Sequence, residues 1–284
     1  MDISCTFVRG RAFWKHPNII EVICHHRVEK IEEWAFYYCP NLRRVIMPGV
    51  KIFEYGAFCN CKALTDVECG KLEVMKERAL FGCKSSRGVN LPSARIVEYA
   101  AFDGCSALTD VKFGSKLERF DNCVFIRCTS LERITIPLKD GIITADDTFQ
   151  ECGNLVRVDL VEGEVHETIA SLNLEDWIND MNREVNSINQ ILPNADAGYD
   201  VDFNDDDVDY GDPGEKARAI RTWIRSVLGK IVHYQAEHQR VLDDAATTLQ
   251  LALPQDILMK NVLPFLELPP HTFEVRDHED DADY

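Results

Sequence analysis

The sequence predicts an α/β repeat fold: a solenoid with a parallel β-sheet on one face, followed by an α-helical C-terminal segment. Residues 1–162 repeat with a period of 22–24 residues, and apolar residues at helical spacing then replace that period. The 284 residues, 45% hydrophobic and 28% charged, have the composition of a folded protein. We divide the chain into a solenoid of about six repeats at 1–162, a helical segment at 163–270 with a disordered acidic loop at 194–212, and an acidic disordered tail at 271–284.

Cysteines mark the repeat most clearly. They recur with spacings of 22, 22, 22, 23 and 24 residues, at Cys39, Cys61, Cys83, Cys105, Cys128 and Cys152. The residues three positions earlier form a second column, Phe36, Phe58, Leu80, Phe102, Phe125 and Phe149. Each copy ends in Leu-x-x-Val-x-apolar, whose last two anchors alternate as in a β-strand. A single such strand cannot bury its apolar face, so the copies are expected to stack in register around a continuous core.

The repeat resembles the BspA-type leucine-rich repeats, whose units read approximately I-x-x-x-A-F-x-x-C-x-x-L-x-x-V-x-I-P. The segment from Ile31 to Pro48 matches this pattern almost position for position, and the resemblance covers about 27–162. A half copy containing Ile20 and Ile23 precedes it, and Ser86 replaces leucine in the third copy, where stacking should loosen. The resemblance implies a leucine-rich-repeat solenoid. Together with the helical end, the arrangement is also similar to leucine-rich-repeat families of diatoms.

The cysteine column has two interpretations, a metal or redox ladder and a set of small buried side chains. Zinc needs four ligands that converge on one point, whereas these thiols lie one per turn along an axis. We therefore favour the structural interpretation and predict no metal or cofactor. The 11 cysteines, with neither a signal peptide nor a membrane-spanning stretch, predict reduced thiols in the cytoplasm, with the nucleus left open.

Helical spacing begins after Gly163. Two apolar seams predict an antiparallel helix pair, within one chain or between two copies: Leu174, Ile178, Met181, Val185, Ile188 and Leu192, and then Ile220, Ile224, Val227, Ile231, Tyr234, His238, Val241 and Ala245. The second helix is expected to start at Asp212-Pro213 and end near Leu251. Facing charges should help to fix the pairing, acidic on the first helix (Glu164, Glu167, Glu175, Asp176, Asp180, Glu184) and basic on the second (Lys216, Arg218, Arg221, Arg225).

The segment 253–266 is similar to the opening of an F-box, the helical motif that docks adaptors onto Skp1 and cullin ubiquitin ligases. Its spacing is Leu-Pro-x-Asp-Ile-Leu-x-x-x-Val-Leu-x-x-Leu. The resemblance implies a substrate adaptor. Only 18 residues follow Leu266, too few for the later helices of an F-box. The alternative is that these apolar residues cap the helical pair.

Most chemistry is excluded by missing motifs and by charge. The nucleotide-binding patterns G-x-G-x-x-G and G-x-x-x-x-G-K-[ST] do not occur, nor do H-E-x-x-H and G-x-S-x-G. An EF-hand alignment from Asp205 places Tyr210 where glycine is needed and Lys216 where glutamate is needed. Residues 1–162 hold 22 basic and 22 acidic residues, and residues 163–284 hold 9 and 26, so nucleic-acid and membrane binding are not expected. We predict no catalytic, cofactor-binding or metal-ligating residue.

What remains is the exposed surface of the predicted sheet. Side chains between the buried strand anchors must point outward and form two columns. One is Arg44, Asp66, Gly88, Asp110, Arg133 and Arg157; the other is Ile46, Glu68, Asn90, Lys112, Thr135 and Asp159. Solenoids bind extended partners on such faces. We predict a non-enzymatic scaffold that binds a protein partner through these residues, with possible self-association through the helical segment.

Overall fold

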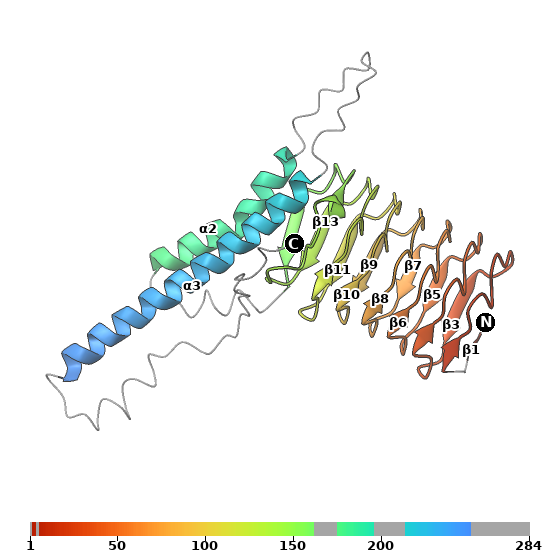
Figure 1. Cartoon of the computed structure of the whole chain (residues 1–284), viewed down its shortest axis with the longest axis horizontal. Helices are drawn as coiled ribbons and strands as arrows, with labels where there is room; N and C mark the ends of the chain where they lie inside the picture. The colour runs from red at the N-terminus through yellow and green to blue at the C-terminus, as the bar shows by residue number, and fades with distance from the viewer. Residues whose placement is uncertain (1, 4–5, 162–174, 196–213, 251–284) are drawn as a thin grey trace, which may run out of the picture. The chain divides into compact units, whose positions relative to one another are not determined.

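The computed structural model describes residues 2–3, 6–161, 175–195 and 214–250. The described residues up to 161 form stacked coils whose strands make two parallel ladders (Figure 1). Every coil contributes a strand to the first ladder, and all but the last two contribute one to the second. The first ladder comprises β1 (Asp2–Ile3), β3 (Glu21–Cys24), β5 (Arg44–Ile46), β7 (Asp66–Glu68), β9 (Gly88–Leu91), β11 (Asp110–Phe113), β13 (Arg133–Ile136) and β14 (Arg157–Leu160). The second comprises β2 (Phe7–Val8), β4 (Lys30–Ile31), β6 (Ile52–Phe53), β8 (Val74–Met75), β10 (Ile96–Val97) and β12 (Arg119–Phe120). The solenoid fold and its parallel ladder are as predicted; the second ladder was not predicted.

The first ladder is divided into two four-stranded sheets, β1-β3-β5-β7 and β9-β11-β13-β14. Among the described residues, no strand pairing joins β7 to β9, although the neighbouring strands pair in register on both sides. The break coincides with Ser86, which stands where the other copies have leucine. Its hydroxyl is buried with no hydrogen-bond partner. A short polar side chain cannot fill the leucine position, which accounts for the looser stacking predicted at this copy.

The core is built from the repeat columns. The phenylalanine rings stack along the solenoid, with centroids 5.1 Å apart for Phe36 and Phe58 and 5.3 Å for Phe102 and Phe125. The cysteine column is buried beside them, as are the leucine column, with Ser86 in the third copy, and the valine column, with Ile134 in the fifth. These layers bury the apolar surface that a single coil would expose.

The prediction of a half copy at the N-terminus was wrong in its extent and in its anchor residues. Ile20 and Ile23 are 61% and 42% exposed, whereas Val22 and Cys24 are buried and occupy the strand positions. The Phe13 ring stacks on Phe36 at 5.0 Å, so the phenylalanine column starts one coil earlier. His16 stands at the cysteine position of this coil, which hides it from the cysteine spacing.

The helical segment comprises α2 (Glu175–Ile191), the 3-10 turn η2 (Leu192–Asn194) and α3 (Glu215–Gln250); a further turn, η1 (Asp146–Phe149), belongs to the solenoid. The helices are antiparallel: the Trp177 and Tyr234 rings stack at 5.2 Å, while the Trp223 indole donates to the Glu184 carbonyl at 3.0 Å. The seam of α3 is buried at Ile220, Ile224, Val227, Ile231 and His238. It is not buried at Val241, which is 53% exposed.

The charge pairing predicted between the helices was wrong for the basic cluster. Arg218 and Arg221 pair with Asp146, and Arg225 pairs with Asp140. Lys230 instead binds the acidic helix, at 2.7 Å from Asp180 and 3.1 Å from Glu184. The seams predicted which helices meet, but not which charges on them face each other. These depend on how each helix is rotated about its axis.

The described residues at the junction of the helices, 188–195 and 214–222, belong to the same compact unit as the solenoid. The Asn189 side-chain oxygen accepts the Val158 backbone N–H at 3.0 Å. The buried Lys216 ammonium donates to the carbonyls of Gly153 and Leu155 at 3.1 and 2.9 Å. These polar contacts cap the coil of β14, the last one that the structure describes, at backbone groups that no further described coil binds.

Several predictions lie outside the described residues: the acidic loop from residue 196 onward, the F-box-like segment 253–266, the tail 271–284, and Leu174, Glu164 and Glu167. In the described part of the chain, no helix is both long and apolar enough to span a membrane.

Candidate functional site: the sheet face

We use the term sheet face for the outward-pointing positions of the first ladder, from β3 to β14. Strand pairing aligns Arg44 with Asp66, and Asp110 with Arg133 and Arg157. The second column is aligned in the same way, as Ile46–Glu68 and as Asn90–Lys112–Thr135–Asp159. The inward neighbours of these residues are buried, so the alternation holds the predicted side chains at the surface.

The charges of the sheet face change along the solenoid. Near the N-terminus, Arg44 lies between two carboxylates, Glu21 at 3.7 Å and Glu68 at 2.5 Å, and the Glu68 contact raises the pKa of the guanidinium. Near the C-terminal end, Arg133 and Arg157 share one carboxylate, Asp159, at 3.6 and 2.8 Å. The outward strand positions therefore have excess negative charge at one end and excess positive charge at the other.

A shallow depression of about 280 Å³ lies at the C-terminal end of the sheet face. Asp110, Arg133 and Arg157 line it, together with Thr109, Glu132 and Val156, which sequence reasoning missed. The missed residues share one repeat position, four residues after each cysteine, and that spacing could have found them. Val156 is 40% exposed and adds an apolar surface between the charges. Two guanidiniums, two carboxylates and one apolar side chain therefore meet at this depression.

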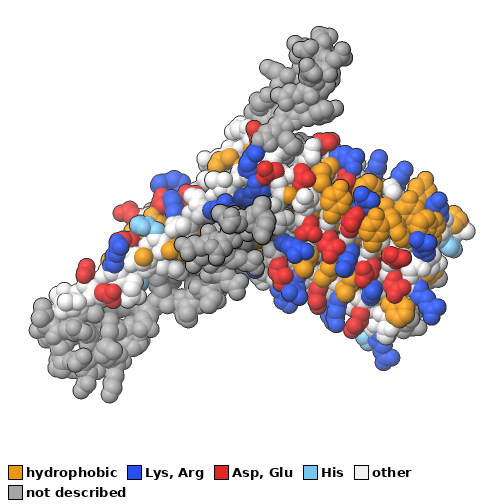
Figure 2. Space-filling view, in the orientation of Figure 1, with side chains coloured by type: hydrophobic (Ala, Val, Ile, Leu, Met, Phe, Trp, Pro, Cys, Tyr) orange, Lys and Arg blue, Asp and Glu red, His pale blue; other side chains and the backbone are white. Residues whose placement is uncertain are grey.

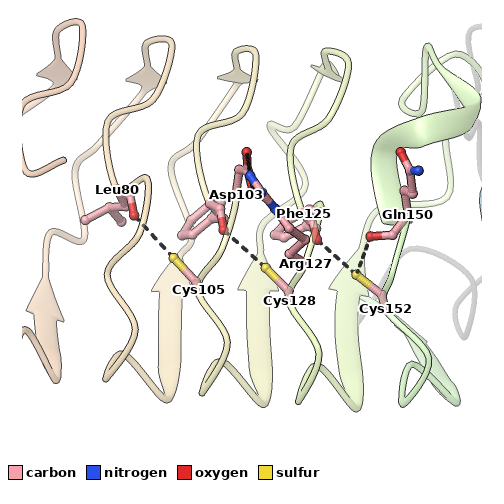
Figure 3. A network of polar contacts seen from close by, with 9 residues as sticks. Leu80, Asp103, Cys105, Phe125, Arg127, Cys128, Gln150 and Cys152 are labelled. Atoms are coloured by element: carbon pink, nitrogen blue, oxygen red, sulfur yellow. Dashed lines mark hydrogen bonds and ion pairs between the residues drawn. The ribbon is translucent and has the colours of Figure 1, made fainter. Parts of the chain in front are cut away.

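The cysteine column is part of the core. Each thiol donates to a backbone carbonyl of the preceding coil, for example Cys105 to Leu80 at 3.2 Å and Cys128 to Phe102 at 3.2 Å (Figure 3). Among the described residues, no group of three or more His, Cys, Asp or Glu side chains could hold a metal ion. The bonds extend over coils from Cys39 to Cys152 and give the thiols a structural role.

The buried thiols should make the protein less stable in alkali. Burial raises the pKa of Cys69 and of Cys105 to about 12, from the usual value of about 9. Their stabilisation is fully present below pH 9 and is lost as the pH rises toward 12, by roughly 1.4 kcal/mol per pH unit for each thiol. Urea unfolding in the presence of a reductant at pH 8 and pH 10.5 measures the decrease in the free energy of unfolding. The double variant Cys69→Ala/Cys105→Ala should show a shallower fall than wild type; equal slopes would contradict this origin.

Coils of 22–24 residues with parallel strands on one side define the protein as a leucine-rich-repeat solenoid, a class that commonly mediates protein–protein interaction. The family model of the BspA type Leucine rich repeat region matches this sequence in 6 copies, over residues 2–96 and 77–176. The chain belongs to this family.

The similar solved structures are bacterial leucine-rich-repeat proteins. The T. pallidum leucine-rich-repeat protein TpLRR is 27% identical, with a TM-score of 0.47, over 50% of this chain and 69% of that one. The pneumococcal vaccine antigen PcpA is 15% identical, with a TM-score of 0.37, over 51% of this chain and 41% of its own. A leucine-rich cell surface protein from Faecalibacterium prausnitzii is 14% identical, with a TM-score of 0.30, over 56% and 84%. Comparison with curated proteins gave no match.

Proposed function

We propose that the protein is a non-enzymatic scaffold that binds a protein partner through the sheet face. The observation that carries the proposal is the pair Arg133 and Arg157 sharing the single carboxylate of Asp159 beside a depression. Both guanidiniums are about half exposed, with 44% and 52% of the side chain accessible. Guanidiniums bind carboxylates bidentately, so an acidic side chain of the partner is the expected contact.

The opposite end of the face favours a partner with a defined direction. Negative charge is in excess there, because three carboxylates surround the single cation Arg44: Glu21, Asp66 and Glu68. A basic side chain of the partner would complement them. Such complementarity fixes the register of an extended segment more than it adds affinity. The cysteine column, whose buried thiols donate hydrogen bonds to backbone carbonyls, is suited to a reducing compartment, and we place the action of the protein in the cytoplasm. Self-association through the helical segment stays a prediction.

The test is affinity capture from native cell lysate, read by mass spectrometry. The full chain is compared with the double variant Arg133→Glu/Arg157→Glu and with a matched control, Arg95→Glu/Arg119→Glu. The control arginines have similar side-chain exposure, 48% each, and are also ion-paired. They belong to the second ladder, where Arg119 lies in β12 and Arg95 directly precedes β10. Partners held by the sheet face should be kept by wild type and control, and lost by the first variant.

Equal capture by all three proteins would overturn binding at this site. A Skp1-like or cullin component captured equally by all three would favour the ubiquitin-ligase adaptor instead. That function rests on the spacing of residues 253–266 and not on the sheet face.

A further inference from the structure

A cluster of aromatic side chains lies outside the core, on the turns that follow the second ladder in the first coils. We call it the aromatic ridge and define it as Trp14, Trp34, Tyr37, Tyr38 and Tyr55. Its rings form one contact network, with centroids 4.5 Å apart for Trp14 and Tyr37 and 4.6 Å for Trp34 and Tyr55. Figure 2 shows hydrophobic side chains gathered over the N-terminal coils on the face in view.

The ridge is not needed to fill the core. The inward column of the same coils is already formed by the half-buried Phe13 and the buried Phe36 and Phe58. Trp14 and Tyr38 remain 39% and 42% exposed. Large aromatic side chains gathered at a surface are uncommon unless they bind something, and tryptophan, tyrosine and arginine are the residues most enriched at binding hot spots.

Three cations lie on the ridge rings. The Arg11 guanidinium is 5.4 Å from the Trp14 ring centroid, and the Lys15 ammonium is 5.8 Å from the same ring. The Lys62 ammonium is 5.8 Å from the Tyr38 ring. Within the described part of the chain, no carboxylate lies within 4.0 Å of these three groups. A ring face orients a cation without neutralising its charge, so these groups are placed to receive an anion.

The surroundings limit what kind of anion can bind. A cleft of about 600 Å³ borders the ridge at Tyr55. Its charged lining has three carboxylates, Glu32, Glu33 and Glu54, and two cations, Arg9 and Lys30, of which Lys30 is paired to Glu54 at 3.0 Å. A nucleic-acid backbone laid along the ridge would bring phosphates against these carboxylates. A short peptide can place its few charges on the cations alone.

We infer that the aromatic ridge binds a short acidic segment of a partner protein that also carries an aromatic or aliphatic side chain. The apolar side chain packs against Trp14 and Tyr38. The carboxylates of the segment pair with Arg11, Lys15 and Lys62, which are already held over the rings and lose little freedom on binding. This surface is separate from the sheet face, and its binding does not depend on Arg133 or Arg157.

The test uses a phage-displayed library of random 12-residue peptides, selected on the full chain. Selected peptides should be enriched in Asp and Glu next to an aromatic or aliphatic residue. Synthetic copies of them should bind the variants Trp14→Ala and Lys15→Glu/Lys62→Glu at least about tenfold more weakly, which corresponds to ~1.4 kcal/mol. The matched control Lys71→Glu/Lys116→Glu reverses two exposed lysines off the ridge and should bind as wild type does, as should Arg133→Glu/Arg157→Glu.

Thermal unfolding shows whether each variant is folded. If Trp14→Ala is not folded, the charge-reversal variant Lys15→Glu/Lys62→Glu still tests the inference. Peptides without acidic enrichment, or peptides that bind the ridge variants as tightly as wild type, would overturn the inference. Tighter ridge-dependent binding of a fluorescent 20-nucleotide oligo-deoxythymidine would overturn it in favour of a single-stranded nucleic acid. Loss of peptide binding in Arg133→Glu/Arg157→Glu alone would assign the peptides to the sheet face.

Discussion

Replacing Phe125 with alanine is expected to lower the free energy of unfolding by about 4 kcal/mol. The ring is fully buried and lies between Phe102 and Phe149, with centroids 5.3 and 5.4 Å away. It also meets the edge of Phe120 at 5.5 Å. Truncation leaves a cavity that three neighbouring rings border, and stacked coils cannot close it without breaking their register.

Another copy of the repeat suggests the control variant for this prediction. Leu80 occupies the same position of its own coil and is buried there, so the fold accepts leucine in the phenylalanine column. Phe125→Leu should therefore cost less than about 2 kcal/mol. Urea unfolding followed by circular dichroism measures both variants. A loss below about 1 kcal/mol for Phe125→Ala would show that the column does not hold the coils together.

Replacing Lys216 with alanine is expected to cost about 3 kcal/mol. Its ammonium is buried and donates to the carbonyls of Gly153 and Leu155 on the last coil. Without it, these carbonyls lose a charged donor on the last coil that the structure describes, where no further described coil supplies backbone N–H groups.

Arg218→Ala is the matched control for Lys216→Ala, because Arg218 lies two residues further along α3. Its side chain is 43% exposed and its ion pair with Asp146 is 3.6 Å long, so the expected loss is under about 1 kcal/mol. Hydrogen exchange at β14 gives a local measurement. Faster exchange in Lys216→Ala and not in Arg218→Ala is expected, and equal exchange in the two variants would rule out the capping role of Lys216.

The regular part of this protein could be predicted because every coil repeats the same local pattern. Leu-x-x-Val-x-apolar and the cysteine spacing determine which side chains point inward, and the alternation of a strand then determines which point outward. The register of Asp110, Arg133 and Arg157 follows from this spacing alone. The first coil was not predicted because His16 stands where the other coils have cysteine. The second ladder was not predicted because its strands are only two residues long, too short to show an alternating pattern.

Contacts that break the repeat required the tertiary structure. The period aligns Thr135 with Asp159, but it does not show that Arg133 and Arg157 share that one carboxylate. Lys216 reaches a carbonyl 63 residues earlier in the chain, and no local pattern relates the two. The aromatic ridge likewise joins rings and cations from neighbouring coils. Periodicity determines which residues stack, because stacking repeats from coil to coil; side-chain rotamers and the packing of the chain's irregular parts do not repeat, so only the folded structure determines those contacts.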